Sequence, residues 1–325
     1  MLLFIVILHF CVHSLYSDVQ DFSTADMITS NLTRGFVIIA VNCFVLISGY
    51  YGIRLKWKSV LNLYLTCAFY GLIAYCIHLH VDNAHVGFSL LKSSVFIFSN
   101  CKWWFISAYI ILMLFAPLLN SAIEHFSRKQ HVWCIVLFTI LQIYLGYGWH
   151  SDLCDDSGFH FLNFIYLYLI GQYIARYVSV DFINKHRWKW LAIYILCSLC
   201  WAGISIISSK NDIPLWHPYA YNNPIVIISA LAFFCFMSSF HFHSKVINWL
   251  ASSALAVYLV QEAPYLKSIW YDGAKNVCEW SGLGKVGCLF AISFLFFFAI
   301  LLIDKIRYYL FQYLFKVIES IQRRK

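Results

Sequence analysis

The chain has 325 residues, of which 62% are hydrophobic and only 12% are charged, and its mean hydropathy is +0.72. Soluble globular proteins carry about 25% charged residues, so this composition excludes a soluble fold and indicates an integral membrane protein. The net charge of +8 does not indicate nucleic-acid binding, because the cations occupy short loops and the C-terminal tail rather than a basic, polar domain.

Apolar runs that approach the ~20 residues needed to cross a bilayer occur ten times along the chain. They cover residues 1–16, 36–53, 60–80, 103–121, 131–149, 160–178, 189–208, 224–241, 247–265 and 284–303. The loops between them are short and no internal repeat is visible. We therefore expect an all-α polytopic membrane protein in which residues 1–325 form a single transmembrane bundle of about ten helices.

The first run, from Met1 to Tyr16, is short and has no basic residue before it. It lacks the charged leader and small-residue cleavage site of a signal peptide. We interpret it as the outer part of a full helix whose cytoplasmic start is missing, for example through a mis-assigned initiation codon. His9 lies roughly 13 Å below the outer edge at 1.5 Å per residue, near mid-membrane, and His13 follows on the same face.

Ionisable groups inside membrane spans are costly and commonly mark function. His9 has two alternative explanations: a metal ligand, or a structural histidine hydrogen-bonded between helices. A metal site would need a third ligand at a predictable spacing, and no HExxH motif or acidic partner is nearby. We therefore expect no metal at His9.

The second run ends in the sequence FVLISGYY at residues 44–51, and Arg54, Lys56 and Lys58 follow at once. The Ser-Gly pair predicts a polar kink and a close backbone approach near one membrane face. The three cations suit either retention of that face in the cytoplasm or binding of a ligand's phosphates. Ser48 lies about 9 Å from Arg54, between the cations and His9.

Further polar candidates are Asn42 in the second run and Tyr258, Gln261 and Glu262 near the outer end of the ninth. A carboxylate at that depth needs a partner or water, although a hydrated helix end before Pro264 explains it equally well. Polar residues of other runs are expected only to hydrogen-bond neighbouring helices. These are Asn62, His78, Gln142 and Gln172.

Most of the twelve cysteines lie inside apolar runs, where they act as small hydrophobes; these include Cys197 and Cys200, the one pair with C-x-x-C spacing. Cys101, Cys154 and Cys278 lie in or near loops that we place outside, where a disulfide is possible but is not specified by the sequence.

Lysine and arginine separate strongly when alternate loops are assigned to opposite membrane faces. One face has 16 of the 23: Arg54, Lys56, Lys58, Arg128, Lys129, Arg176, Lys185, Arg187, Lys189, Lys245, Lys305, Arg307, Lys316, Arg323, Arg324 and Lys325. The other face has 7, together with an acidic loop at residues 152–156. Because cytoplasmic loops are enriched in cations, ten spans with both termini cytoplasmic fit best.

Taken together, these segments resemble the membrane acyltransferase-3 family, whose members modify bacterial surface polysaccharides and lipid-linked sugars. The segments that carry the resemblance follow family order: FIVILHFCVH, CFVLISGYY, KWWFISAYIILMLFAPLLN, INWLASSALAVYLVQEAPYLKSIW and FFFAILLIDKIRYYLF. It covers nearly the whole chain, and the Ser-Gly and Trp-Phe segments are its most specific parts. Family members have about ten core helices.

Two positions depart from the family pattern. Relatives usually carry Arg or Lys ten residues before the first-helix histidine, a place upstream of Met1 here. The departure indicates either a truncated start or a crippled enzyme. Relatives also often have His where this chain has Gln261, which weakens any role for that position.

The resemblance implies transfer of an acyl group, most often acetyl from acetyl-CoA, to a sugar hydroxyl of an exopolysaccharide, O-antigen or lipid-linked glycan precursor, in the bacterial inner membrane. Such a hydroxyl needs a base, and histidine, with an ordinary pKa of ~6.5, suits this role. The expected base is His9. Ser48 would contact the acyl group or its oxyanion, and the cations Arg54, Lys56 and Lys58 would face the CoA phosphates.

The remaining contacts to substrate would come from the other polar candidates of the spans: Asn42, His13, Tyr258, Gln261 and Glu262. Two other classes of function stay open. A transporter or flippase of lipid-linked saccharides also uses polar groups at mid-membrane, but neither inverted repeats nor helices broken at mid-span by Gly or Pro are convincing here. An inactive structural partner in polysaccharide assembly is the third.

Overall fold

The computed structural model describes residues 1–17, 23–81, 91–92, 96, 103–149, 157–211, 213, 215, 217–240, 242–264 and 266–322. The regular elements of this part are helical. They are α1 (Leu2–Phe10), the π-helix η1 (Cys11–Leu15), α2 (Thr24–Val37), α3 (Ala40–Tyr51), α4 (Trp57–Val81), α6 (Trp104–His125), α7 (Arg128–Thr139), the π-helix η4 (Ile140–Gly148), α8 (Phe161–Tyr177), α9 (Val180–Lys185), α10 (Arg187–Lys210), α11 (Pro224–Ser238), α12 (Lys245–Ala251), α13 (Ala254–Gln261), α14 (Lys267–Val277) and α15 (Gly282–Gln322).

The expectation of an all-helical membrane protein is confirmed, and each of the ten predicted runs contains helix. Within the described ranges, six helices are long and apolar enough to cross a bilayer. They are Thr24–Tyr51, Trp57–His80, Trp104–His125, Arg128–Gly148, Arg187–Lys210 and Gly282–Lys316. The helices of the other four predicted runs are shorter.

The second run begins earlier than predicted, because residues 24–35 form most of α2 rather than a loop. Ser23 caps this helix by accepting a hydrogen bond from the Asp26 backbone N–H at 3.0 Å. Asp26 then accepts from the Gly282 N–H at 2.8 Å and lies 3.5 Å from Lys285 Nζ, so the start of α2 is fixed to the start of α15. Tertiary contacts of a polar segment, which hydropathy does not detect, account for the error.

The tenth run ends later than predicted, since α15 continues to Gln322. Lys305 and Arg307, counted above as cations of a cytoplasmic tail, are buried side chains of this helix together with Asp304. Arg307 forms an ion pair with Asp304, with Nη2–Oδ2 at 2.8 Å. This ion pair makes the burial of Arg307 and Asp304 tolerable. Since Lys305 and Arg307 lie inside the bundle and not in a tail, they do not support the assignment of cations to the cytoplasmic face.

The ninth run is interrupted at Ser252 and Ser253, which separate α12 from α13. The sequence analysis considered breaks at Gly or Pro, and this break lies at two serines near the start of the run instead. Lys305 Nζ donates to the Trp249 carbonyl and, at 2.9 Å, to Ser252 Oγ, so polar groups of α15 stabilise the break.

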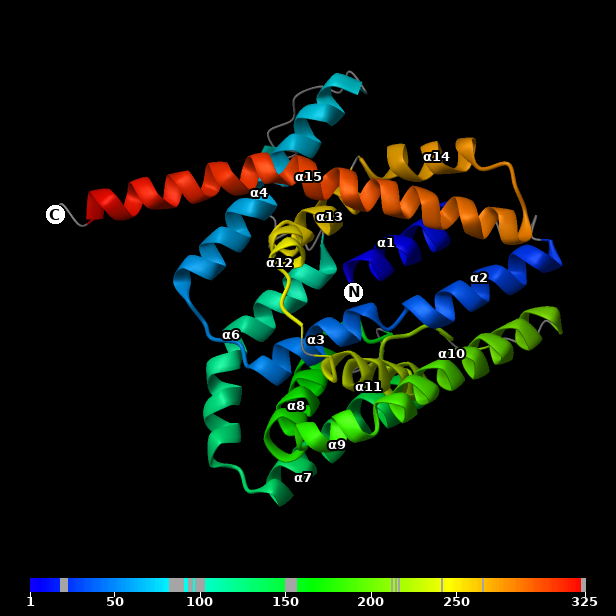
Figure 1. Cartoon of the computed structure of the whole chain (residues 1–325), viewed down its shortest axis with the longest axis vertical. Helices are drawn as coiled ribbons and strands as arrows, with labels where there is room; N and C mark the ends of the chain where they lie inside the picture. Colours follow the sequence, from blue (N-terminus) through cyan, green and yellow to red (C-terminus); the bar gives the residue numbers. More distant parts are fainter. Residues whose placement is uncertain are drawn as a thin grey trace.

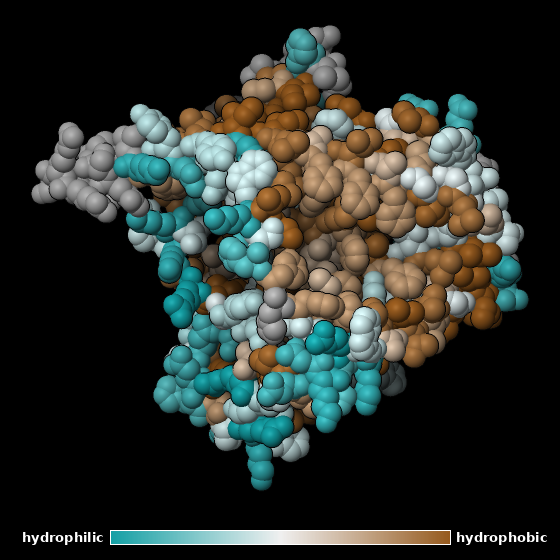
Figure 2. Space-filling view, in the orientation of Figure 1, coloured by the Kyte–Doolittle hydropathy of each residue, from teal (hydrophilic) through white to brown (hydrophobic). Residues whose placement is uncertain are grey.

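Helix α1 lies inside the bundle, against α2, α3, α13 and α15 (Figure 1). Five of its nine residues are buried apolar side chains, and Leu2, Leu3 and Phe4 pack against the core, which makes the helix part of it. Side chains of apolar residues cover the middle of the visible face, and hydrophilic ones gather mainly at the lower left (Figure 2). This distribution suits a protein whose long sides contact lipid.

Helices α3 and α8 touch at backbone distance because each contributes a glycine. A Cβ added at Gly49 would lie 2.4 Å from the carbonyl oxygen of Tyr168, and one at Gly171 would lie 2.5 Å from that of Leu46. The glycine of the Ser-Gly segment therefore permits the close approach that the sequence predicted.

Gly49→Ala should lower the stability of the folded protein by about 1–3 kcal/mol, because the added methyl group overlaps the α8 backbone. Thermal unfolding of the purified protein in detergent measures the effect. Gly203→Ala is the matched control: its Cβ would meet nothing within 4 Å in α10, so this variant should unfold at or slightly above the wild-type temperature. Equal unfolding temperatures for both variants would contradict the packing argument.

Candidate functional site

His9 and Glu262, which are far apart in the sequence, form a pair in the structure. Nδ1 of His9 lies 3.1 Å from Oε1 of Glu262, with the Nδ1–H bond not aimed straight at the oxygen. Glu262 follows the last residue of α13, and Pro264 prevents the helix from continuing. The end of α13 therefore presents the carboxylate to the last turn of α1.

Tyr271 is a third member of this site, and the sequence analysis did not identify it. Its hydroxyl donates a short hydrogen bond to Oε1 of Glu262 from α14, a helix that the prediction left as loop. The only signal for it was a tyrosine nine residues after an intramembrane glutamate. Tyr271 also packs edge-on against Phe10, at 5.6 Å between ring centroids.

The helix changes from α to π after Phe10, one residue beyond His9. The π-helix η1 contains His13, whose ring centroid lies 5.7 Å from that of His9 and 5.6 Å from that of Tyr271. Ser14 donates to the Tyr271 carbonyl at 2.6 Å, which fixes α14 to the same segment. π-bulges are frequent at functional sites because they redirect the side chains around them.

The depth of this cluster can be measured along α15. Lys285 pairs with Asp26 near one end, and Arg307 lies 22 residues later, or about 33 Å at 1.5 Å per residue. Phe10 contacts Phe296, midway between these two, with ring centroids 5.4 Å apart. The hydrocarbon core of a bilayer is about 30 Å thick, so the residue next to His9 lies near the middle of the helix bundle.

Of the other predicted contacts, one lies beside the His9–Glu262 pair and two hydrogen-bond to backbone carbonyls of neighbouring segments. Tyr258 lies beside the pair, 6.4 Å from His9 between ring centroids. Gln261 is fully buried and donates to the Val6 carbonyl at 3.2 Å, holding α13 against α1 one turn before the histidine. Asn42, also fully buried, donates to the Tyr221 carbonyl at 2.9 Å and connects α3 to the segment before α11.

Ser48 does not reach His9. Its hydroxyl bonds to the Phe44 carbonyl at 3.0 Å and lies 3.2 Å from the Tyr109 hydroxyl. Tyr109 stacks on Phe105 at 5.8 Å, and Phe105 contacts Tyr258 at 5.9 Å. Aromatic rings therefore separate Ser48 from the His9–Glu262 pair.

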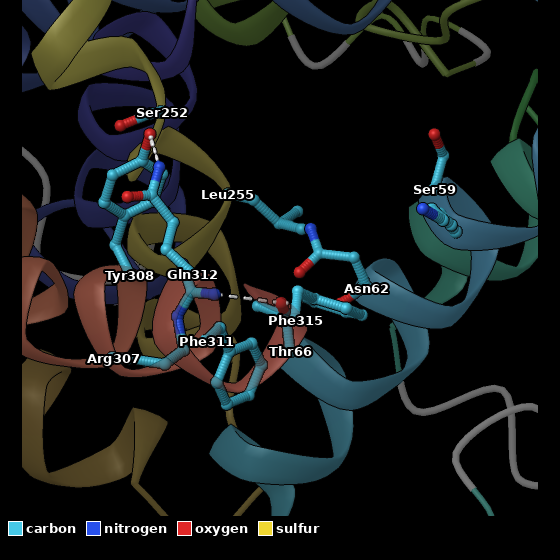
Figure 3. A pocket seen from close by; sticks show the side chains of 11 residues that line it. Ser59, Asn62, Thr66, Ser252, Leu255, Arg307, Tyr308, Phe311, Gln312 and Phe315 are labelled. Atoms are coloured by element: carbon cyan, nitrogen blue, oxygen red, sulfur yellow. Dashed lines mark hydrogen bonds between the residues drawn. The ribbon is translucent and has the colours of Figure 1, made fainter. Parts of the chain in front are cut away.

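Of the three predicted phosphate ligands, Lys58 borders a cavity. Arg54, Lys56 and Lys58 are all exposed around the start of α4. Lys58 lines a space of about 390 Å³ between α4, α15 and the α12–α13 break. Figure 3 shows polar and aromatic side chains converging on this space. They include Ser59, Asn62, Ser252, Tyr308 and Gln312, and the aliphatic Leu255 also lines the space.

Two hydrogen bonds order the wall of this cavity. Arg307 Nη1 donates to Thr66 Oγ1 at 3.1 Å, and Gln312 Nε2 donates to the Tyr308 hydroxyl at 2.7 Å (Figure 3). Asn62, for which we expected only packing between helices, lines the cavity. The sequence offered no signal for it, because an asparagine in a span suits either role.

The described residues contain no group of three or more His, Cys, Asp or Glu side chains that could hold a metal. Cys278 is a free thiol and is buried, while Cys101 and Cys154 lie outside the described residues. The cluster around His9 consists of two histidines, a carboxylate and a tyrosine, all of which can exchange protons. A histidine whose Nδ1 faces a carboxylate can accept a proton on Nε2, and the carboxylate stabilises the imidazolium that forms.

Residues 1–313 match a protein family described as an acyltransferase domain. Neither the curated proteins nor the solved structures contain a match.

Proposed function

Given that the chain belongs to the acyltransferase 3 family and is a multi-pass membrane acyltransferase, we propose that it transfers an acetyl or other short acyl group from acyl-CoA to a sugar hydroxyl. The acceptor is an exopolysaccharide, an O-antigen or a lipid-linked glycan precursor. The observation that carries the proposal is the His9–Glu262 pair, a base with its carboxylate partner near the middle of the bundle.

The reaction needs a base because a sugar hydroxyl does not ionise near neutral pH. His9 Nε2 takes the hydroxyl proton as the oxygen attacks the thioester carbonyl. The tetrahedral intermediate then collapses, the C–S bond breaks, and the CoA sulfur leaves with a proton returned by the imidazolium. Glu262 stabilises the imidazolium between these steps, and Tyr271 orients Glu262.

The donor would enter at the end of the bundle that carries Arg54, Lys56 and Lys58. The cavity of about 390 Å³ beside Lys58 would take its polar part. Leu255 lines this cavity and lies seven residues before Glu262, a distance of about 10 Å along α13. Ser48, whose hydroxyl lies 3.2 Å from that of Tyr109, would contact the acyl arm.

We place the enzyme in the bacterial inner membrane with both termini in the cytoplasm, where acyl-CoA is made. The bias of lysine and arginine toward one set of loops supports this orientation. It retains its direction when the buried Lys305 and Arg307 are removed from the count.

The direct test is an assay of the purified full chain in lipid nanodiscs with acetyl-CoA and an oligosaccharide acceptor. Release of free CoA thiol together with an ester on the sugar is the expected result. Movement of a lipid-linked saccharide across the bilayer without thioester consumption would instead establish the flippase alternative.

Replacing Arg54, Lys56 and Lys58 by glutamine should raise the KM for acyl-CoA by about tenfold, with kcat little changed. The reason is that charge-assisted contacts to the donor's phosphates act on binding rather than on the chemical step. Initial rates at varied acyl-CoA concentration measure the effect. The control is the pair Arg128→Gln and Lys129→Gln, exposed cations at the start of α7. A change in expression or membrane orientation with an unchanged KM would show that the three cations only anchor the protein.

A further inference from the structure

A second and larger cavity, of about 760 Å³, opens between α2 and α10. Its wall includes Thr24 and Met27, next to Asp26, which contacts the start of α15. The cavity beside Lys58 contacts α15 at Arg307, 22 residues after Lys285. The two cavities therefore lie toward opposite ends of the bundle, separated by about 22 residues of α15, or roughly 33 Å at 1.5 Å per residue.

The lining of this cavity is polar and positively charged. Hydroxyl and amide groups come from Thr24, Ser30, Asn31, Ser205, Ser208 and Ser209. Arg34 and Lys210 add two cations, and the described lining contains no carboxylate. Its volume lies in the range of 300–1,000 Å³ typical of small-molecule sites. A complementary ligand is anionic and carries hydroxyl groups.

Arg34 is held over an aromatic ring and has no ion-pair partner among the described residues. Its guanidinium lies 4.1 Å from the centroid of the Tyr219 ring, and its buried Nε has no hydrogen-bond partner among the described residues. The described part of the chain also gives it no carboxylate partner. A buried donor of this kind carries a desolvation cost that a bound oxyanion would remove.

Tyr219 is itself fixed by Asn31. The tyrosine hydroxyl donates to Asn31 Oδ1 at 2.8 Å, while Asn31 Nδ2 donates to the Met27 carbonyl at 2.9 Å. Burial raises the pKa of the Tyr219 hydroxyl, which therefore stays protonated and keeps donating. Asn31 orients Tyr219, and Tyr219 orients the face of the Arg34 guanidinium. The cation is thus preorganised rather than mobile.

The cavity wall touches the helix that carries the base. Ser30 Oγ lies 3.8 Å from Sγ of Cys11, which lies between His9 and His13. The segment from His9 to Tyr16 runs toward the same end of the bundle, because Tyr16 contacts Thr29 and Lys285. A molecule held in this cavity would therefore be one helix away from the reacting groups.

We propose that the cavity between α2 and α10 is a binding subsite for an acidic sugar residue of the acceptor glycan, with Arg34 binding its carboxylate or phosphate. This inference rests on the proposed transfer to a sugar hydroxyl. Donor and acceptor then enter from opposite ends of the bundle, and the surrounding serine and asparagine side chains bind the sugar hydroxyls.

The test measures binding without turnover. The full chain with His9→Ala, in nanodiscs of zwitterionic lipid, is titrated with an oligosaccharide containing glucuronic acid and with the same oligosaccharide containing glucose. The acidic ligand should bind more tightly, and Arg34→Gln should weaken its binding about ten- to a hundredfold without affecting the neutral ligand. A sugar phosphate should show the same dependence on Arg34.

Arg128→Gln is the matched control, since Arg128 also lies over tyrosine rings, at 5.9 Å from Tyr173 and 5.8 Å from Tyr177, but in α7. It should leave binding unchanged. If the Arg34→Gln protein bound the acidic oligosaccharide as tightly as the protein that retains Arg34, the subsite would be overturned. Displacement of that ligand by phosphatidylglycerol vesicles, with affinity for the lipid dependent on Arg34, would also overturn it and assign the cavity to a lipid headgroup.

These results can be separated from a failure of the proposed function. Acyl transfer that persists in Arg34→Gln with unchanged acceptor KM would reject the subsite and leave the enzyme assignment intact. Binding that depends on Arg34 in a protein that never consumes acyl-CoA would retain the subsite and reject sugar acylation.

Discussion

His9→Ala should lower the rate of acyl transfer by about 10²- to 10⁴-fold, the usual contribution of general-base catalysis. His9 lies 3.1 Å from Glu262 and beside Phe10, which contacts the middle of α15. Folding should change little, because Glu262 keeps its hydrogen bond from Tyr271 when the imidazole is removed. Single-turnover rates with acetyl-CoA and the glycan acceptor measure the loss.

His13→Ala is the control for this experiment, because His13 has the same side chain four residues further along the same segment and is exposed. Its effect should be much smaller. The KM for acyl-CoA should be similar in wild type and His9→Ala, since the cations proposed to bind the donor lie at one end of the bundle. A His9→Ala protein of normal abundance that acylates its glycan at the wild-type rate would disprove the base assignment.

Glu262→Gln should lower kcat by about 10²- to 10⁴-fold, while the KM for acyl-CoA stays within about twofold. In serine-protease triads the corresponding carboxylate-to-amide change costs about 10⁴-fold, because the imidazole adopts the wrong tautomer and its cation loses a partner. In Glu262→Gln the new side-chain amide could donate a hydrogen bond to Nδ1 of His9. The imidazole proton would then lie on Nε2, which is the atom that must accept the proton of the sugar hydroxyl. Steady-state kinetics that separate kcat from KM measure the change.

Tyr271→Phe should have a smaller effect, about tenfold on kcat, because it removes only the hydrogen bond that orients Glu262. Glu279→Gln provides the matched control, since Glu279 is an exposed carboxylate in the following loop. If Glu262→Gln raised the acceptor KM and left kcat unchanged, Glu262 would be a substrate contact rather than the partner of the base.

The sequence determined the class of protein and the approximate positions of its spans. Hydropathy depends on the composition of each segment alone, so a run such as residues 103–121 indicates a membrane helix without reference to any neighbour. The same local information identified His9 and Glu262 as costly groups in apolar surroundings. It also predicted that Gly49 permits close packing, because only glycine lacks the Cβ that would prevent it.

Only the tertiary structure decided which of these residues meet. The contacts of His9 with Glu262 and of Ser14 with Tyr271 join segments more than 250 residues apart. Such pairs depend on how helices pack, and hydropathy gives each helix no orientation relative to the others. The same limit explains why α2 was missed and why Lys305 and Arg307 were misplaced: partners distant in sequence make polar groups tolerable inside the bundle, and no local pattern records those partners.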